Sequence, residues 1–515
     1  MGEGPPAETL IAQSIAEIGQ ERWNSCFPGV LEDYDYLAAV EAAGLDGFVW
    51  RYIAVQDQNG QTVAAAPVFV TDHRLDLTLA PAVRRMTALV RRVYERALVM
   101  RLAALGSPCL EDVGVGFAPA LGPAQRIDAL GRIMEGLETV AVRENAWLLA
   151  VKDAPERDRE LWSIALGPDG WGRAPGMPGA ELPITFADEQ GYLARLGRQT
   201  RKDMRRKLRS RSAIEIERRT SLAGLEDRID ELYRQTRERS SLQFETLTAA
   251  YFTGVLARME GRASCVLYWR GRELLGFNLL LSDGRTLLDK FFCMGSEGRD
   301  HDLYFLSWFE NVGFCVRNNL ARYQSGQAGY GSKLRLGSRL IGADLWFRHR
   351  RAWLDVLLQR LAPYVFEDPV AEDARTHPSS PPPSPPASRA LGLIPALIWV
   401  AMPVLSVLNQ FCAETLAQIL KPLAFGPQWL LHAMGSKWLW LWLALEVATL
   451  TVWTRILSET ALSKAFPLTA LSYVLVIAMG WAFFHEPMSP LQWVGGAAIL
   501  AGIKLIGMDN AEARS

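Results

Sequence analysis

Two contrasting patterns of apolar residues divide the sequence. From residue 11 to residue 365, short apolar runs typical of strands alternate with charged, helix-like stretches, which is a mixed α/β order. Downstream of residue 389, arginine and lysine become scarce and four long apolar stretches follow one another. Each approaches the roughly 20 residues that a helix needs to cross the hydrocarbon core of a membrane. These four stretches are about 391–408, 438–457, 466–484 and 491–507. The pattern predicts a soluble α/β part followed by an all-α bundle of transmembrane helices.

A change of composition marks the boundary between the two parts. The run THPSSPPPSPPAS, residues 376–388, holds too few apolar residues to pack and too many prolines for helix or sheet. We therefore expect a linker at 367–388 and a four-helix membrane domain at 389–508. A short N-terminal extension is expected at 1–20.

Tryptophans and charged residues near the apolar stretches bear on membrane topology. Tryptophans border the stretches, as interfacial aromatic residues do, although a hydrophobic soluble helical domain is the alternative. Arg389, Arg455 and Lys464 favour a cytoplasmic position of their loops, whereas Lys421 and Lys437 argue against it. The first 20 residues lack the basic start and apolar run of a secretory signal. We expect a multi-pass protein of the plasma (inner) membrane, with its soluble N-terminal domain in the cytoplasm.

Charge and cysteine content exclude two classes of partner. The 515 residues carry a net charge of −1, which gives no general attraction to polyanions, so nucleic acid is not an expected partner. The six cysteines lie far apart, without a CxxC pair or a histidine at zinc-site spacing. We expect a reducing compartment and no metal.

Two segments of the apolar part resemble a transporter family. They are AFPLTALSYVLVIAMGWAFFHEPMSPLQWVGGAAILAGIKLIG at 465–507 and NQFCAETLAQILKPLAF at 409–425. The first is similar to the closing helix pair of drug/metabolite transporters, and the second to the first helix of their small multidrug resistance branch. That branch includes the subunits that flip aminoarabinose-linked undecaprenyl phosphate. The resemblance implies a transporter-like domain.

Two carboxylates in these stretches are candidate transport residues. Glu414 lies late in the first stretch and Glu446 within the second, and burying either in lipid costs on the order of 3 kcal/mol. Glu414 also lies close enough to the helix end to reach the interface instead. Small residues between 495 and 502 suit close helix contact, either inside the bundle or in a homodimer.

The soluble part contains an apparent internal repeat. Its first half holds WRYIAVQDQNGQTVAAAPVFVT from Trp50, and its second half holds SCVLYWRGRELLGFNLLLSDGRTLLDKFFCM from Ser264. Both show an apolar strand, a charged turn with glycine, and a second strand, and each is followed by a helix and another strand. The repeat predicts two related α/β lobes, at 21–185 and 186–366.

Three segments of the second half resemble the GNAT superfamily, specifically its double-lobed FemAB-like acyltransferases. They are LGRQTRKDMRRKLRS at 196–210, ELLGFNLLLSDGRTLLDKFFCM at 273–294 and HDLYFLSWFENVGFCVRNNLARYQSGQAGYGSKLRLG at 301–337. The resemblance implies tandem GNAT-like lobes and acyl transfer from a thioester. The sequence departs from close relatives at Tyr330-Gly331-Ser332, where they often have Glu-His, so their substrate choice is not carried over.

The glycine-rich segment and the basic helix are candidate ligand-binding elements. Gly326, Gly329 and Gly331 let backbone approach a ligand closely, while Lys333 reaches a phosphate or carboxylate. An ordinary flexible loop has the same composition. In the basic segment, Lys202, Arg206 and Arg209 share one face at helical spacing. That face either binds phosphates and lipid headgroups or is simply solvated.

The catalytic candidates are fewer. The resemblance to GNAT enzymes, in which tyrosine often protonates the leaving thiolate, makes Tyr330 a candidate proton donor, with a structural hydroxyl as the alternative. His301 is a candidate general base. Asp289 and Lys290 follow a hairpin strand, where a role in the site and a plain ion pair are equally open interpretations.

Together these features predict an N-acyltransferase. Its donor is acyl-CoA or acyl carrier protein, and its acceptor is an amine, membrane-delivered or lipid-linked: an amino lipid, a sphingoid base or an aminosugar on a polyprenyl carrier. Membrane lipids are the expected surroundings. The alternative is a small-multidrug-resistance-like transporter or flippase whose GNAT-fold domain is catalytically silent. A third possibility is a scaffold whose helices only anchor it.

Overall fold

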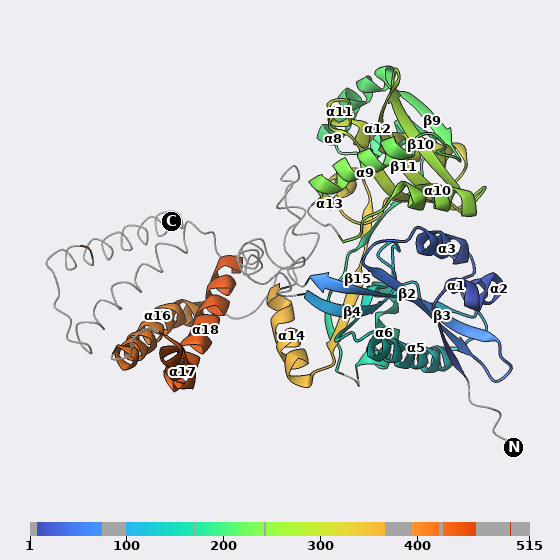
Figure 1. The fold of residues 1–515 in the computed structure, drawn as a ribbon. Coiled ribbons are helices and arrows are strands. Elements are labelled where there is room, and N and C mark those ends of the chain that lie inside the picture. The colour runs from blue at the N-terminus through green and yellow to red at the C-terminus, as the bar shows by residue number, and fades with distance from the viewer. Residues whose placement is uncertain are drawn as a thin grey trace. The chain divides into compact units, whose positions relative to one another are not determined.

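The computed structural model describes residues 8–74, 99–167, 170–240, 244–365, 394–421, 426–459 and 495 (Figure 1). The chain divides into two compact units, residues 1–382 and 383–515. The division falls inside the proline-rich segment 367–388 expected to be a linker. Each unit is described by itself.

The first unit holds two mixed β-sheets, which confirms the α/β prediction. The first sheet has the order β1-β2-β3-β4-β6-β15-β7, with β5 paired to β3. Its strands are β1 (Thr9–Ala12), β2 (Phe48–Gln56), β3 (Thr62–Arg74), β4 (Val99–Leu105), β5 (Gly116–Phe117), β6 (Leu148–Pro155), β7 (Gly172–Pro175) and β15 (Ala343–His349).

The second sheet has the order β14-β8-β13-β12-β11-β10-β9. Its strands are β8 (Gly179–Pro183), β9 (Glu215–Arg219), β10 (Ala263–Arg270), β11 (Glu273–Ser282), β12 (Thr286–Met294), β13 (Arg322–Gln324) and β14 (Arg339–Ile341).

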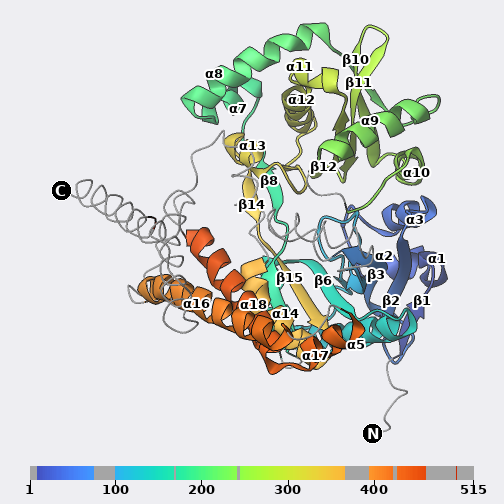
Figure 2. The ribbon, with the colours of Figure 1, turned by 60° about the vertical axis from the view of Figure 1, so that its left-hand side comes forward.

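The two sheets exchange strands across the division expected at residue 185. β8 comes before that point, yet it pairs with β13 and β14 of the second sheet. β15 comes after it, yet it pairs with β6 and β7 of the first sheet (Figure 2). Because each lobe borrows a strand from the other half of the chain, the lobes are joined by backbone hydrogen bonding as well as by packing.

Each lobe contains a parallel strand pair connected through a helix. β4 pairs in parallel with β6 in the first lobe, and β12 pairs in parallel with β13 in the second. The second pair is short, from Thr286 to Leu288 on β12, although β12 runs on to Met294. Beyond Leu288 the two strands of the described second lobe are no longer paired with each other.

Helices cover both sheets. Those of the first half are α1 (Ile15–Ile18), α2 (Gln20–Asn24), α3 (Tyr34–Ala42), α5 (Pro123–Arg143) and α6 (Arg159–Leu166). Those of the second half are α7 (Glu189–Arg195), α8 (Arg198–Lys207), α9 (Glu226–Arg239), α10 (Ala249–Arg258), α11 (Ser296–Asp300), α12 (Leu303–Arg317), α13 (Tyr330–Arg335) and α14 (Ala352–Val365). Short 3₁₀ helices span Glu156–Asp158 and Leu208–Ala213.

One apolar cluster runs through both lobes. It includes Tyr36 and Leu37 of α3 together with Tyr251 and Phe252 of α10. The hydroxyls of Tyr36 and Tyr251 lie 2.8 Å apart inside it, so the buried tyrosines satisfy each other where the lobes meet. The lobes therefore form a continuous core.

The second unit is described as helices only: α16 (Ile394–Leu420), α17 (Pro427–Gly435) and α18 (Lys437–Glu459). α16 packs against α18, and these two helices contain the first two apolar stretches. The third and fourth stretches lie outside the described residues apart from Gly495. Among the residues that the structure describes, no helix is both long and apolar enough to span a membrane.

Candidate active site

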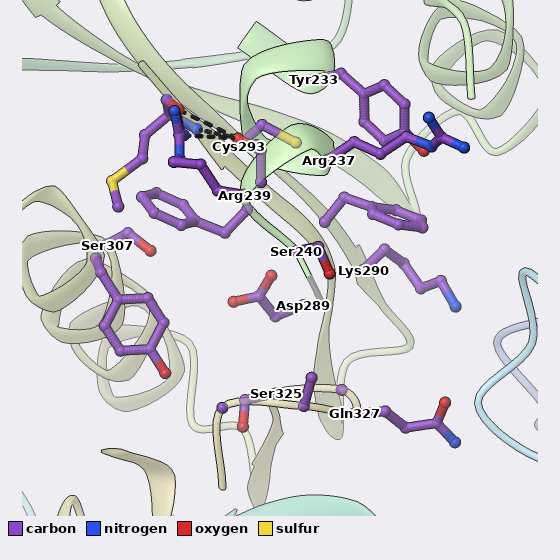
Figure 3. Close-up of a pocket in the computed structure, with 18 of the residues that line it drawn as sticks. Tyr233, Arg237, Arg239, Ser240, Asp289, Lys290, Cys293, Ser307, Ser325 and Gln327 are labelled. Carbon is purple, nitrogen blue, oxygen red and sulfur yellow. Dashed lines mark hydrogen bonds between the residues drawn. The ribbon is translucent and has the colours of Figure 1, made fainter. Parts of the chain in front are cut away.

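A cavity of the second lobe opens where β12 and β13 stop pairing. It has a volume of about 450 Å³ and is lined by β12, α9, α12 and the glycine-rich segment before α13 (Figure 3). Its walls combine the rings of Phe244, Phe291 and Phe292 with polar and charged groups. The cavity therefore suits a ligand with both apolar and hydrogen-bonding parts.

Asp289 of β12 extends into this cavity (Figure 3). Its Oδ1 accepts a hydrogen bond of 2.6 Å from Asn278 Nδ2 on β11. Its Oδ2 accepts bonds of 3.2 Å from Asn311 Nδ2 on α12 and 2.7 Å from the hydroxyl of Tyr323 on β13. Asn278, Asn311 and Tyr323 are almost completely buried, so three separate elements hold one carboxylate in a fixed orientation.

The surroundings of Asp289 favour its neutral form. Burial raises the pKa of its carboxyl group, while the hydrogen bonds from Tyr323 and Asn278 and the charge of Lys333 act in the opposite direction. A carboxylate with a raised pKa that opens onto a cavity is a stronger base than a solvated aspartate. Asp289 can therefore accept a proton from a group bound in the cavity.

Lys290, the next residue, also lines this cavity and fastens β12 to the first lobe. Its Nζ donates to Glu32 Oε1 at 2.5 Å, to the Cys109 carbonyl at 2.7 Å and to Glu111 Oε1 at 3.1 Å. Burial lowers the pKa of Lys290, but the two carboxylates outweigh it and the net shift is upward. The two side chains diverge and do not pair with each other: Asp289 accepts bonds from Asn278, Asn311 and Tyr323, whereas Lys290 pairs with Glu32 and Glu111 (Figure 3).

The glycine-rich segment closes the cavity. Gly326 has a φ of +69°, and a Cβ there would lie 3.3 Å from the Asp289 carbonyl, so the segment requires glycine to pass this close to β12. Gln327 Nε2 donates to Asp153 Oδ2 at 2.9 Å and to the Glu111 and Met177 carbonyls, all from the first half of the chain. The segment is thus held against the first lobe.

Lys333 is buried and turned toward its own loop. Its Nζ donates to the carbonyls of Ser325 at 2.5 Å and Gly326 at 3.0 Å, although the residue also lines the cavity. The sequence predicts that this ammonium reaches a phosphate or carboxylate of a ligand. In the structure it satisfies backbone carbonyls that a turn of glycines would otherwise leave unpaired.

The other predicted site residues are dispersed. Gly329 lines the cavity with Gly326, whereas Gly331, Tyr330 and His301 are not among its lining residues. Tyr330 is the first residue of α13 and is 1% exposed. His301 follows α11, and its carbonyl accepts a bond from Ser210 Oγ. Their catalytic roles stay predictions.

The basic helix ends earlier than the sequence pattern predicts. α8 stops at Lys207 and a 3₁₀ helix follows, so Arg209 does not continue the face that carries Lys202 and Arg206. Arg206 is exposed, pairs with Asp203 at 2.7 Å and lies outside the cavity lining. In the second unit, Glu414 is half-buried on α16 and Glu446 is exposed on α18.

Sequence reasoning did not place Asp289 among its catalytic candidates. Asn278 and Asp289 are separated by a single hairpin, but Asn311 and Tyr323 join them only through the fold. The detectable signal was polar residues inside otherwise apolar strands and helices, Asn278 in ELLGFNLLL above all. No cluster of three or more His, Cys, Asp or Glu side chains suited to a metal occurs in the described part of the chain.

Comparison with known families agrees with this geometry. Residues 197–334, which include the cavity-forming strand β12 and the glycine-rich segment, match the family model of the acetyltransferase (GNAT) domain. The protein is a GNAT-type acyltransferase, and the domain implies acyl-CoA as its co-substrate. The solved structures to which the chain is similar include FemX (14% identity, TM-score 0.45, 68% of this chain and 100% of that chain) and a tandem GNAT protein from the clavulanic acid biosynthesis pathway (12%, 0.41, 67% and 98%).

A separate stretch of the chain has curated relatives of a different kind. The chain is 34% identical over 113 residues, 22% of its length and 95% of the relative, to the "Probable 4-amino-4-deoxy-L-arabinose-phosphoundecaprenol flippase subunit ArnE" of Salmonella newport (strain SL254). The protein of that name from Pseudomonas savastanoi pv. phaseolicola (strain 1448A / Race 6) is 37% identical over 77 residues, 15% of this chain and 68% of the relative. Through this stretch, the chain belongs to the ArnE family.

Proposed function

We propose that the protein transfers an acyl group from acyl-CoA to the nitrogen of an amine, with Asp289 as the general base. The observation that carries this proposal is the Asp289 carboxylate, held by three buried donors and directed into the cavity of the GNAT domain. An amine attacks a thioester only after losing its extra proton, so the reaction needs a base at this position.

The step balances with the groups that this site provides. The amine nitrogen attacks the thioester carbonyl carbon, the C–N bond forms and the C–S bond breaks. Asp289 takes one proton from the ammonium group before the attack and later releases it to solvent. The second proton, which nitrogen loses as the amide forms, goes to the thiolate of coenzyme A as it leaves. The raised pKa of Asp289 suits a base that must take a proton from an ammonium group.

The unpaired edge of β12 is where we place the donor's amide-bearing arm. β13 pairs with β12 only as far as Leu288, so the backbone groups of β12 next to Asp289 are free of a neighbouring described strand on that side. An extended chain with amide groups can hydrogen-bond to such an edge as an added strand does. Phe291 and Phe292 give apolar walls for methylene groups. Acyl carrier protein, the other donor expected from the sequence, is without support from the family match.

We further propose that the acceptor amine is lipid-linked and that the ArnE-like part resides in the membrane. Membership of the ArnE family supports this, because the named relatives are subunits of a flippase for a lipid-linked aminosugar. One chain would then acylate an amphiphile at the inner leaflet and anchor or flip the product. Glu414 and Glu446 stay the candidate transport residues, and the small residues at 495–502 a candidate homodimer contact.

The alternative is a transporter or flippase whose GNAT-fold domain is silent. It is favoured only by the ArnE relationship, since the polar network around Asp289 has no evident use in a silent domain.

Labelled acyl-CoA, incubated with the purified full chain and a membrane lipid extract, separates the two functions. The proposal predicts label in an extractable amide, with at least a hundredfold loss in Asp289→Asn. Asp300→Asn, an exposed carboxylate on nearby α11, is the matched control and should retain activity. Absence of labelled product from the parent protein would support the silent-domain alternative.

A further inference from the structure

The helix α14 presents an apolar face to solvent. Trp353, Val356 and Leu357 are 65%, 49% and 45% exposed, and their i, i+3, i+4 spacing puts them on one side of the helix. Arg360, also exposed, falls on the same face. A surface helix normally turns charged and polar residues outward, so this stripe calls for a partner.

The opposite face of α14 already has its partner in the protein. Ala362 and Leu358 pack against Phe347 and Leu345 of β15 and Ala174 of β7. Gln359 Nε2 and the backbone N–H of His349 both bond to Asp355, which fixes the start of the helix. The exposed stripe therefore lies on a helix anchored to the first sheet (Figure 1).

Three exposed arginines lie on α14 or just before it. Arg350 and Arg351 are exposed just before α14, and their guanidinium groups lie over the ring of Trp147 at 5.4 Å and 4.7 Å. Within the described residues, neither these arginines nor Arg360 forms an ion pair with a carboxylate. Exposed tryptophan beside arginine is the combination found at the headgroup level of a bilayer, where apolar side chains enter lipid and guanidinium groups contact phosphates.

We propose that the exposed face of α14 lies on the surface of an anionic lipid bilayer. α14 is the last element that the structure describes in the first unit, and residues 366–393 separate it in the sequence from α16 of the second. The inference rests on the proposed membrane location of the ArnE-like part, because a covalent link to a membrane-bound part raises the effective concentration of α14 at the surface and makes even weak docking effective. Docking would hold the acyltransferase lobes next to a lipid-linked acceptor.

A nitroxide label on α14 tests this in the full chain. The six cysteines are buried, so Val356→Cys provides a selective labelling site. Ile164→Cys is the matched control: Ile164 has 48% exposure on α6, on the opposite face of the same sheet. Both proteins are reconstituted into nanodiscs of phosphatidylcholine with or without phosphatidylglycerol. Collision rates of the label with oxygen and with a water-soluble nickel complex are then measured by power saturation.

Docking predicts that the label at 356 collides severalfold more with oxygen than with nickel in anionic nanodiscs, while the label at 164 favours nickel. Arg350→Glu with Arg351→Glu should reverse the result at 356. A label at 356 that favours nickel in all nanodiscs, or that is shielded from both reagents by protein, overturns the proposal. Alkaline carbonate extraction of native membranes reports separately on the anchor: release of the protein would refute the membrane location itself, whatever the label shows.

Discussion

Lys290 Nζ lies 2.5 Å from Glu32 Oε1, which joins side chains that are 258 positions apart in the sequence. The contact ties the strand that carries Asp289 to the first lobe, and the Lys290 side chain is only 2% exposed. Since Asp289 and Lys290 are adjacent on β12, the first lobe helps to fix the position of the proposed base in the second lobe.

Lys290→Met should destabilise the contact between the lobes. It leaves Glu32 and Glu111 buried without their cation, which typically costs about 3–5 kcal/mol. Hydrogen exchange of β12 amides in the full chain is the measurement, and faster exchange is expected. The double variant Lys290→Met/Glu32→Gln should recover part of the lost stability, because it removes one of the two buried carboxylate charges that are left without a cation. Unchanged exchange in the single variant would show that the pair contributes little.

The same variant should be more sensitive to alkaline pH than the parent. Burial raises the pKa of Glu32 to about 7, against the effect of Lys290, and loss of the ammonium moves it further up. A folded pKa above the unfolded value means that the folded state binds the proton more tightly, so stability falls as the pH rises from the unfolded pKa through the folded one. The deficit in Lys290→Met should thus be smaller at pH 5 than at pH 8. A deficit independent of pH contradicts this assignment.

Tyr323→Phe should shift the acid limb of the pH–activity profile. The hydroxyl of Tyr323 lowers the pKa of Asp289 by donating to Oδ2 at 2.7 Å, so its removal raises that pKa further. Because the base works as the carboxylate, the limb of kcat/KM should move to higher pH, by about one unit for a hydrogen bond to a charged group. Tyr192→Phe, which loses a comparable buried bond to the Leu336 carbonyl, is the control and should leave the limb in place. A uniform loss of rate without a shift would reduce Tyr323 to a structural role.

Lys333→Met should loosen the glycine-rich segment. The ammonium bonds to the Ser325 and Gly326 carbonyls, and a thioether cannot replace it, so two buried acceptors lose their donor. Amides of residues 325–329 should exchange about tenfold faster, which corresponds to roughly 1.4 kcal/mol. Exchange at the level of the parent would instead leave Lys333 available for the ligand role predicted from the sequence.

Local patterns in the sequence were sufficient for much of the fold. In the hairpins that begin at Trp50 and Ser264, apolar residues either alternate with polar ones or run without interruption along whole strands. This pattern was enough to predict β2, β3 and β10 to β12. The exchange of β8 and β15 between the lobes could not be predicted. The spacing of apolar residues in a short strand does not indicate which distant strand it pairs with. The glycine-rich segment was found by composition. The role of Asp289 depends on residues from β11, α12 and β13 that only the folded chain brings together.

Glu446→Gln tests whether the ArnE-like part handles substrate or only anchors the enzyme. Glu446 lies on α18 and is exposed beside Val447, with Leu443 one turn earlier, so it interrupts an apolar face. In a bilayer, such a carboxylate costs on the order of 3 kcal/mol unless a substrate amine, a proton or another helix compensates it.

A helix that only anchors the protein gains nothing that offsets this free-energy cost. The variant should acylate a detergent-solubilised acceptor at the rate of the parent, and should turn over a membrane-embedded acceptor, or move the product between leaflets, severalfold more slowly. Glu459→Gln, at the last residue of the same helix, is the matched control and should behave like the parent in both assays. Equal behaviour of Glu446→Gln and the parent would make Glu446 an interfacial residue. If an unrelated anchor in place of residues 389–508 also preserves both activities, the relationship to ArnE records ancestry and no transport.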